Sequence, residues 1–475
     1  MAFNKKILLI ISFMTLASCS ETPSHNISVS DNMAVPEITE NVTETEDTTE
    51  PETETVPTTE PPPPPVTKGN IYDTNGNLLM YSEDDRRISA DVYAVPFANI
   101  ITEMSGGYDT CFEDILRNAP DGKDIGNSVQ LTIDADVQNA LYSYMADMNL
   151  VGSVVVMRTD GSILSQVSYP SYDPSAIEKP EYDEELAWGA CGNKAFQNAE
   201  PGSCFKIMSE VIADKHGIYS VWDEGEWTDD GATIVNWDSK TNGYYPMERS
   251  LYSAFINSSN IFFAKAFNEI GKEDVLEDLD GIFHFVTDIQ CDFGDIENNI
   301  EINCNDDLRR SAFGQSYILT CPLYLAALGR EAVFGDMVRP FVLQNVIDTN
   351  NPETIIEKGS SPNDVIASIP EDYRQNLLDG MSGVAAGLGI YLPENFTLYA
   401  KTGTAETWVG DYLYITGCLK NSDDTAGRSY DYNNYNGSYI VVMQIQNPAE
   451  HGLSFASESA SYYQGIVNTI LGSRN

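Results

Sequence analysis

The sequence predicts an α/β protein in which helices flank an antiparallel sheet and an inserted all-helical subdomain interrupts that sheet. An apolar hairpin around an Asp-Gly turn, GSVVVMRTDGSILSQVSYP, comes early, at residues 152–170. Further apolar strands come late, in FTLYAKTGTAETW, DYLYITGCLK and SYIVVMQIQNP. The pattern of residues 180–390, between the two groups, is mostly helical. Strands at both ends of a helical region imply one sheet built from distant segments.

The first 19 residues have the pattern of a secretory signal. Lys5 and Lys6 precede an apolar run over residues 7–17, which is too short to span a membrane as a stable helix. The run ends in Leu-Ala-Ser-Cys, which resembles a bacterial lipobox. The resemblance implies cleavage before Cys19, lipid attachment to Cys19, and a mature protein anchored on the extracytoplasmic face of the cell membrane. In an ordinary signal peptide, Cys19 would be incidental.

Residues 20–67 are rich in Thr, Glu and Pro and contain 11 acidic residues but no Lys or Arg. Such a segment has too few apolar side chains to form a core. Charge repulsion and the run of five prolines favour an extended chain. We therefore expect a disordered linker that holds the rest of the protein away from the membrane.

The composition excludes several classes of partner. The 475 residues include 72 acidic and 26 basic ones, and this net charge of -46 argues against nucleic-acid binding. The four histidines are scattered and the sequence has no Cys-x-x-Cys, so we expect no metal and no other cofactor. Seven cysteines remain besides Cys19, an odd number, and a disulfide between Cys291 and Cys304 is left open.

The remaining elements follow in chain order. Residues 68–127 form a small N-terminal segment, in which YDTNGNLL predicts strand, Asn-Gly turn and strand. SVQLTIDADVQNALYSYMADM predicts a strand followed by an amphipathic helix. FASESASYYQGIVNTILG predicts a C-terminal helix that ends at Gly472.

A serine and a lysine three residues apart suggest nucleophilic catalysis. In NAEPGSCFKIM, Ser203 and Lys206 lie one helical turn apart and face the same side of a helix. A serine hydroxyl becomes a good nucleophile when a base removes its proton. Lys206 can be this base if burial or a nearby cation keeps its amine neutral. The alternative is a helix-capping serine beside a solvated lysine.

Two further motifs could complete a site. Ser258 and Asn260 lie in AFINSSNIFFAKAF, in the region with a helical pattern, where a capping cluster is the alternative interpretation. Lys401, Thr402, Gly403 and Thr404 lie on the predicted strand FTLYAKTGTAETW. A cation beside a glycine that permits close backbone approach suits an anionic substrate group, although a solvated lysine at a strand end would look the same.

Ser-x-x-Lys, Ser-x-Asn and Lys-Thr-Gly in this order and spacing are the signature of penicillin-binding proteins and serine β-lactamases. Flanking segments such as EPGSCFKI, FGQSYILTCPLYLAAL and YAKTGTAE resemble penicillin-binding transpeptidase segments, and the resemblance covers residues 128–475. KGNIYDTNGNLL is similar to the opening of class B penicillin-binding proteins, so residues 68–127 resemble a short pedestal. The resemblance implies a lipid-anchored, class B-like penicillin-binding protein with a transpeptidase domain.

The resemblance implies peptidoglycan D,D-transpeptidation through an acyl-enzyme on Ser203. Lys206 would take the proton of Ser203, Ser258 would relay a proton to the leaving amine, and Asn260 would orient the substrate amide. Stem peptides and β-lactams are the expected ligands. The lipid anchor would attach the protein to the membrane, and cell-wall synthesis proteins are further possible partners.

In the same resemblance, Lys401, Thr402 and Thr404 would hold the terminal carboxylate of the substrate, with Gly403 between them. The backbone N–H groups of Ser203 and Thr404 would form the oxyanion hole.

The sequence departs from the family pattern at two positions, and other functions stay open. Cys204 replaces the usual Thr, and Ser316 replaces a usual Gly. A D,D-carboxypeptidase would use the same residues. A serine β-lactamase would need a base for the deacylating water, for which Glu301 has a suitable spacing. A β-lactam sensor or a catalytically silent scaffold is a further alternative.

Overall fold

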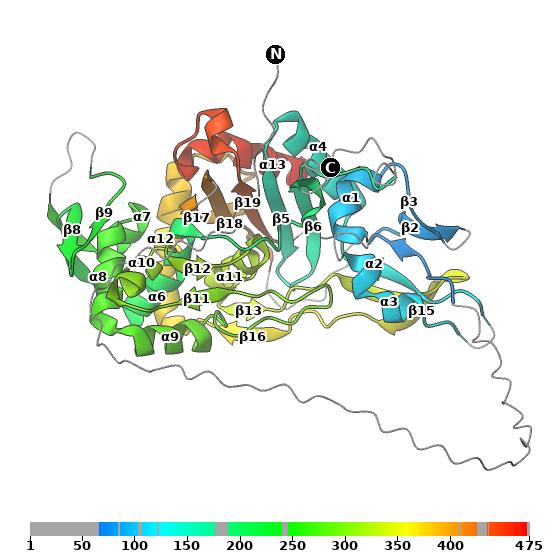
Figure 1. Cartoon of the computed structure of the whole chain (residues 1–475), viewed down its shortest axis with the longest axis horizontal. Coiled ribbons are helices and arrows are strands. Elements are labelled where there is room, and N and C mark those ends of the chain that lie inside the picture. The colour runs from blue at the N-terminus through cyan, green and yellow to red at the C-terminus, as the bar shows by residue number, and fades with distance from the viewer. Residues whose placement is uncertain are drawn as a thin grey trace, which may run out of the picture. The chain divides into compact units, whose positions relative to one another are not determined.

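The computed structural model describes residues 66–83, 86–102, 107–120, 123–175, 189–239, 246–407, 410–424, 435 and 437–472 (Figure 1). The predicted signal, Cys19 and nearly all of the predicted linker lie outside the described residues. Within the described ranges, no helix is both long enough and apolar enough to cross a membrane.

In the part of the chain that the structure describes, five antiparallel strands form a central sheet in the order β17-β18-β19-β5-β6. The strands are β5 (Gly152–Arg158), β6 (Ile163–Tyr169), β17 (Phe396–Thr407), β18 (Gly410–Asn421) and β19 (Tyr439–Ile445). The predicted early hairpin and the three late strands are therefore confirmed, as is their pairing into one sheet. Strand β17 lies at one edge, next to the helical region.

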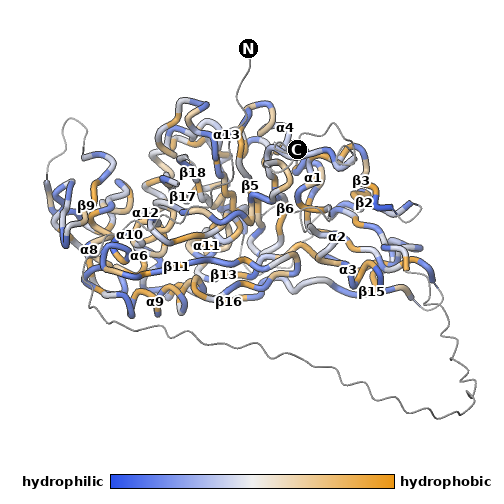
Figure 2. The backbone as a smooth tube through the Cα atoms, viewed as in Figure 1, coloured by the Kyte–Doolittle hydropathy of each residue, from blue (hydrophilic) through white to orange (hydrophobic). Residues whose placement is uncertain are grey.

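Helices cover both faces of this sheet. Alternate residues of β5 point to opposite faces: Val154 and Val156 pack with α4 (Ala135–Asp147) and α13 (Ala460–Gly472). Val155 and Met157 belong to the larger cluster, which includes α11 (Pro322–Phe334) and the helical region. Figure 2 shows hydrophobic stretches along the sheet strands and α11, as burial on both faces requires.

The helical region contains more strand than the sequence predicts. Its helices are α6 (Lys206–Lys215), α7 (Leu251–Ile256), α8 (Asn260–Ile270), α9 (Lys272–Gly281), α10 (Asn305–Ser311) and α12 (Glu371–Leu388). Short strand pairs lie between them: β7 (Ser220–Asp223) with β10 (Met247–Ser250), β8 (Glu226–Asp229) with β9 (Ala232–Val235), β11 (Asn299–Glu301) with β12 (Tyr317–Leu319), and β13 (Asp336–Val338) with β16 (Val365–Ser368). The expectation of an all-helical subdomain is wrong in this respect, because such short, partly exposed strands leave little period-two pattern.

A second sheet joins the N-terminal segment to the rest of the protein. Its order is β15-β14-β4-β1-β2-β3, and strands from residues 128–358 pair directly with those of residues 71–89. The strands are β1 (Ile71–Tyr72), β2 (Leu78–Glu83), β3 (Arg86–Ser89), β4 (Ser128–Leu131), β14 (Leu343–Asp348) and β15 (Asn351–Lys358). Short helices α1 (Ala94–Ile101), α2 (Tyr108–Cys111) and α3 (Glu113–Leu116) complete this part.

Three further sequence predictions can be compared with the structure. The YDTNGNLL hairpin, the helix after residue 134 and the C-terminal helix are all present, as β1–β2, α4 and α13. Cys291 and Cys304 are free thiols, so the disulfide left open by the sequence is not formed.

Asp73 connects the first hairpin to the start of α4. The buried carboxylate accepts hydrogen bonds from the backbone N–H of Asn75 (2.9 Å) and Asn77 (2.7 Å) in the turn. Its other oxygen accepts from the N–H of Ala135 (3.1 Å), at the start of α4. Desolvation raises the pKa of this carboxyl group, and these hydrogen bonds oppose the shift.

We expect Asp73→Ala to lower the free energy of unfolding by about 2–3 kcal/mol, because it leaves buried N–H groups without partners. Urea unfolding of the soluble chain measures the change. The control is Asp136→Ala, an exposed carboxylate in the first turn of α4, with an expected change within about 0.5 kcal/mol. Equal effects of the two substitutions would contradict this role of Asp73.

Candidate active site

Ser203 lies in the 3₁₀ turn η2 (Gly202–Phe205), which leads directly into α6. Gly202 has a φ of +52°, and a Cβ there would lie 2.3 Å from the carbonyl oxygen of Thr404. Only glycine allows both this conformation and this approach. The turn is thereby pressed against strand β17, and Ser203 lies beside Thr404.

Lys206 brings the first two motifs together. Its Nζ lies 3.0 Å from Ser203 Oγ, 3.1 Å from Ser258 Oγ and 2.7 Å from Asn260 Oδ1. It also donates to the backbone oxygen of Ser258 at 2.8 Å. A neutral amine has two N–H donors and one lone pair. It can donate to the Asn260 and Ser258 carbonyl oxygens and accept the proton of Ser203.

Burial makes the neutral form of Lys206 accessible. The side chain is fully buried, and its Nζ lies 5.9 Å from the ring centroids of Phe263 and of Phe313. Desolvation lowers the pKa of Lys206 well below its ordinary value, and the positive charge of Lys401 lowers it further. Two aspartates, Asp223 and Asp238, oppose the shift. Lys206 therefore has the electrostatic environment of a general base.

Ser258 is held in a strained conformation between α7 and α8. Its φ of +54° lies in the left-handed region, which non-glycine residues rarely adopt. The adjacent Ser259 caps α8, since its Oγ accepts from the N–H of Phe262 (3.1 Å) and donates to Asp223 Oδ2 (2.7 Å). Strain of this kind persists where the surrounding structure fixes it, commonly at functional sites.

A polar network outside the three sequence motifs fixes this turn. Asn236 accepts from the backbone N–H of Asn260 (2.7 Å) and donates to both oxygens of buried Asp223 (2.8 and 2.9 Å). The guanidinium of Arg249 forms an ion pair with Asp223 at 2.6 Å. These residues belong to no motif, so only their three-dimensional positions reveal their role.

Lys401 contacts Ser258 from the side of the sheet. Its buried Nζ donates to Ser258 Oγ (3.2 Å) and to the carbonyl oxygen of Thr402 (3.0 Å). Burial lowers the pKa of Lys401 to about 8. The hydroxyl of Ser258 therefore lies between the amines of Lys206 and Lys401, and the structure brings all three motifs into one site.

The remaining residues of the third motif position strand β17. A Cβ on Gly403 would lie 2.7 Å from the carbonyl oxygen of Pro201 and 2.8 Å from Cys204 Sγ, so glycine is required for this packing. Cys204 is buried against β17 and β18, where its thiol donates to the carbonyl oxygen of Lys401 (3.6 Å). The thiol thus fills the space between the turn and the sheet without displacing Ser203.

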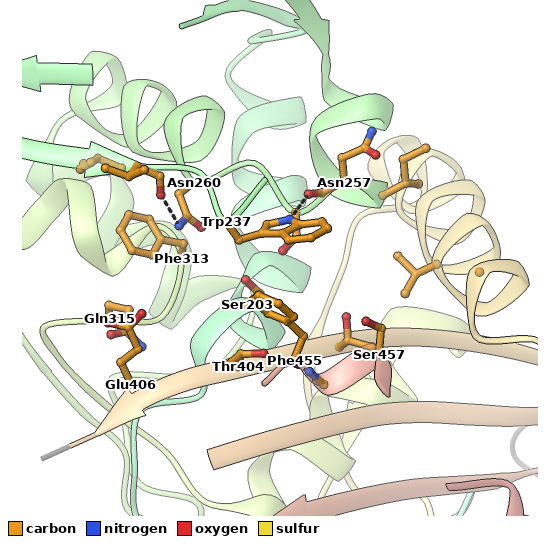
Figure 3. Close-up of a pocket in the computed structure, with 18 of the residues that line it drawn as sticks. Ser203, Trp237, Asn257, Asn260, Phe313, Gln315, Thr404, Glu406, Phe455 and Ser457 are labelled. Atoms are coloured by element: carbon orange, nitrogen blue, oxygen red, sulfur yellow. Dashed lines mark hydrogen bonds between the residues drawn. The ribbon is translucent and has the colours of Figure 1, made fainter. Parts of the chain in front are cut away.

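An open cavity of about 480 Å³ lies in front of Ser203 (Figure 3). Ser258, Asn260, Thr402 and Thr404 also line it. Trp237 and Phe455 approach from opposite walls, with ring centroids 5.4 Å apart. Trp237 is held by a hydrogen bond from its Nε1 to the backbone oxygen of Asn257 (2.9 Å). These two aromatic residues, both partly exposed, also lie outside the motifs.

Residues 152–470 match the family model described as the penicillin-binding protein transpeptidase domain. This chain belongs to the penicillin-binding protein transpeptidase family. The match covers the greater part of the chain. Within the matched residues, Ser203, Lys206, Lys401 and the Ser-x-Asn turn are in contact.

Solved structures of a D,D-transpeptidase domain and of penicillin-binding proteins share the fold of this chain. One is the D,D-transpeptidase domain of a peptidoglycan glycosyltransferase from Eggerthella lenta, with 19% identity and a TM-score of 0.67, covering 87% of this chain and 100% of that one. Another is PBPA from Mycobacterium tuberculosis, with 19% identity and a TM-score of 0.67, covering 85% and 99%. Pseudomonas aeruginosa PBP2 has 20% identity and a TM-score of 0.66, covering 86% and 97%.

Two residues noted in the sequence can now be placed. Ser316 adopts a φ of +74°, a left-handed conformation that favours glycine, and its Oγ donates to Asp307 Oδ1 at 2.9 Å. Glu301 is exposed on β11 and does not line the cavity around Ser203. Glu406, near the end of β17, is the carboxylate that lines this cavity among the described residues.

The pKa shifts of the two lysines predict a bell-shaped pH dependence for acylation of Ser203 by penicillin. The rate should rise with pH as Lys206 loses its proton, at a pH well below the ordinary lysine value. It should fall through about pH 8 as Lys401 loses the charge that holds Ser258 and disfavours protonation of Lys206.

Stopped-flow acylation between pH 5 and 10 measures the profile. Lys206→Arg should abolish the reaction, because a guanidinium stays protonated in this range. The matched control, Lys265→Arg, changes a lysine that pairs with Glu224 outside the cavity and should leave the profile unchanged. A rate that still climbs above pH 9 would contradict the assignment of Lys401.

Proposed function

We propose that this protein is a peptidoglycan D,D-transpeptidase that cross-links stem peptides through an acyl-enzyme on Ser203. The observation that carries the proposal is the buried amine of Lys206, 3.0 Å from Ser203 Oγ and electrostatically disposed to be neutral. Family membership supports the same reaction.

In the first half-reaction, Ser203 Oγ attacks the carbonyl carbon of the penultimate D-alanine. A C–O bond forms, and the proton of Ser203 passes to Lys206. The hydroxyl of Ser258, hydrogen-bonded to both lysines, then gives a proton to the leaving amine and is reprotonated from Lys206. The C–N bond breaks and terminal D-alanine leaves.

The edge strand β17 supplies the binding groups for the substrate. The hydroxyls of Thr402 and Thr404 line the cavity, where they can donate to the terminal carboxylate of the peptide. The Oγ of Thr404 also accepts a hydrogen bond from the N–H of Ala456 (3.1 Å). We assign the oxyanion hole to the backbone N–H groups of Ser203 and Thr404. Lys401 holds the hydroxyl of Ser258, and its charge lowers the pKa of Lys206.

In the second half-reaction, an amine of a neighbouring stem peptide replaces Ser203 on the acyl group. A β-lactam mimics the D-Ala-D-Ala end and acylates the same serine, but its leaving group stays attached. The Mycobacterium tuberculosis PBPA structures include acyl-enzyme complexes with imipenem and penicillin G, and this similarity supports β-lactam binding here.

The position of the acidic residues favours transfer over hydrolysis. A β-lactamase needs a base that activates water beside the acyl group. Glu301 is exposed on β11 and lies away from the cavity lining, and Glu406 lies toward the end of the cavity that also contains Gln315. D,D-carboxypeptidase activity, with water as acceptor, is the second candidate, because it uses the same catalytic residues.

The location of the protein is part of the proposal. We propose a lipoprotein signal over residues 1–19, lipid attachment at Cys19, and a linker over residues 20–67 that holds the enzyme above the extracytoplasmic membrane surface. Residues 68–127 form the short pedestal and 128–475 the transpeptidase domain. The basic start, the apolar run and the lipobox-like Leu-Ala-Ser-Cys support this assignment.

Ser203→Ala should abolish covalent labelling by a fluorescent penicillin, because it removes the nucleophile while leaving the fold intact. Gel fluorescence and intact-mass spectrometry measure the labelling. Ser220→Ala, which changes an exposed serine on β7, is the control and should label like the native protein. Full labelling of the Ser203→Ala variant would disprove the assignment.

The penicilloyl adduct should persist for many minutes, because no carboxylate among the described residues is placed to activate water beside the acyl group: Glu406 lies toward the end of the cavity that contains Gln315. Intact-mass spectrometry follows the adduct over time, and Glu301→Gln should not change its lifetime. Rapid return of unmodified protein with excess penicilloate, slowed by Glu301→Gln or Glu406→Gln, would instead identify a hydrolase.

Cys19→Ala should remove lipid labelling and the processed form of the protein. Metabolic labelling with a fatty acid analogue and membrane fractionation provide the measurement. Cys111→Ala, at an exposed cysteine of α2, is the control and should keep both. Unchanged lipid labelling of the Cys19→Ala variant would rule out this anchor.

A further inference from the structure

The two ends of the cavity around Ser203 differ in chemistry. Toward one end lie Gln315 and Glu406, and Figure 3 shows both on one side of Ser203. Toward the other side lie Asn257 and Ser457, beside the helix α12. At this second end, the described residues of α7 and α12 that line the cavity are all aliphatic or glycine, and none carries a charge. They are Ile256, Gly383, Val384, Gly387 and Leu388.

Two glycines of α12 at this end have different surroundings. A Cβ on Gly383 would lie 2.8 Å from Ile256 Cγ2 and 3.0 Å from the hydroxyl of Tyr252, so this glycine is required for packing against α7. A Cβ on Gly387 would meet no atom within 4 Å. Glycine is among the least favourable residues for a helix, and packing does not require it at position 387. The absence of a side chain at position 387 leaves free space at the cavity wall.

The direction of β17 indicates which part of a substrate reaches this end. Thr402, Thr404 and Glu406 follow one another along the cavity. Of the three, Thr402 therefore lies farthest from the end that contains Glu406 and Gln315. The neighbouring Lys401 packs over the ring of Phe255 of α7 (5.5 Å), and Gly380 of α12 abuts the same ring. The α12 end thus lies beyond the groups that bind the terminal carboxylate.

We propose that the α12 end of the cavity admits the acceptor amine and that Gly387 sets the size of its entrance; this inference rests on the proposed transpeptidase function. After D-alanine leaves, the acceptor must attack the acyl carbon from the vacated side. That side is the end lined by α12, whereas the acyl chain extends toward Glu406.

The apolar lining selects a primary amine on an aliphatic chain. Ile256, Val384 and Leu388 contact methylene groups favourably, and an uncharged wall disfavours the ammonium form of an amine. The neutral nitrogen attacks the acyl carbon, a C–N bond forms, and the C–O bond to Ser203 breaks. The proton that the nitrogen loses passes through Ser258 and Lys206 to Ser203 Oγ, so the reaction needs no other reactant.

The test measures how the acyl-enzyme partitions between an amine and water. The donor is the thioester benzoyl-D-alanyl-thioglycolate, whose leaving group is small. The acceptors are Nα-acetyl-L-lysine amide and methylamine, which have similar basicity but different length. Product ratios are determined by chromatography for the native protein, Gly387→Leu and Gly281→Leu.

Gly281→Leu is the matched control. Gly281 is an exposed glycine in the last turn of α9, and a Cβ there would also meet no atom within 4 Å. Both substitutions replace a helical glycine by a better helix former in open space, so both variants should fold. Only position 387 lines the cavity.

Gly387→Leu should lower the ratio of aminolysis to hydrolysis about tenfold for the lysine derivative and distinctly less for methylamine. Gly281→Leu should leave both ratios unchanged. An unchanged ratio for Gly387→Leu, an equal loss for both amines, or a native acyl-enzyme that the lysine derivative does not intercept would overturn the inference. Failure of the native protein to form any acyl-enzyme would instead overturn the proposed function.

Discussion

The site depends on one buried amine. Lys206 Nζ lies within 3.1 Å of atoms from Ser203, Ser258 and Asn260, and it is fully enclosed by the protein. Hydrogen bonds fix its position, and burial lowers its pKa. An exposed lysine in the same sequence motif would be an ammonium group at neutral pH and could not accept the proton of Ser203. The surrounding fold therefore sets the protonation state on which the proposed reaction depends.

Three features keep this amine in place and favour its neutral form. Gly202 and Gly403 allow the turn that carries Ser203 to press against β17. The ion pair of Asp223 with Arg249, together with Asn236, fixes the strained turn that carries Ser258. The charge of Lys401 further disfavours the ammonium form of Lys206. Each feature comes from a different part of the chain, so the site forms only when the central sheet and the helical region have assembled.

The sequence predicted the central sheet and the site motifs because both have strong local signals. The five strands are long and apolar, and the three motifs share an order that is specific to one superfamily. The network around Asp223 carries no such signal, since Asp, Asn and Arg are common polar residues and their contact depends on tertiary structure. The short strands β7 to β13 and β16 were missed because three or four partly exposed residues leave little periodicity. Likewise, the open space at Gly387 depends on tertiary structure, which the sequence pattern does not reveal.

The most direct test of this account is the charge of Lys206 itself. NMR of protein labelled with ¹³C at lysine Cε can follow the titration of each lysine, with the Lys206 signal assigned by its loss in Lys206→Arg. The account predicts that Lys206 titrates well below the ordinary lysine value and is largely neutral at the pH of fastest acylation. A Lys206 signal that stays in the ammonium form up to pH 10 would contradict it, because no neutral amine would then be present to activate Ser203.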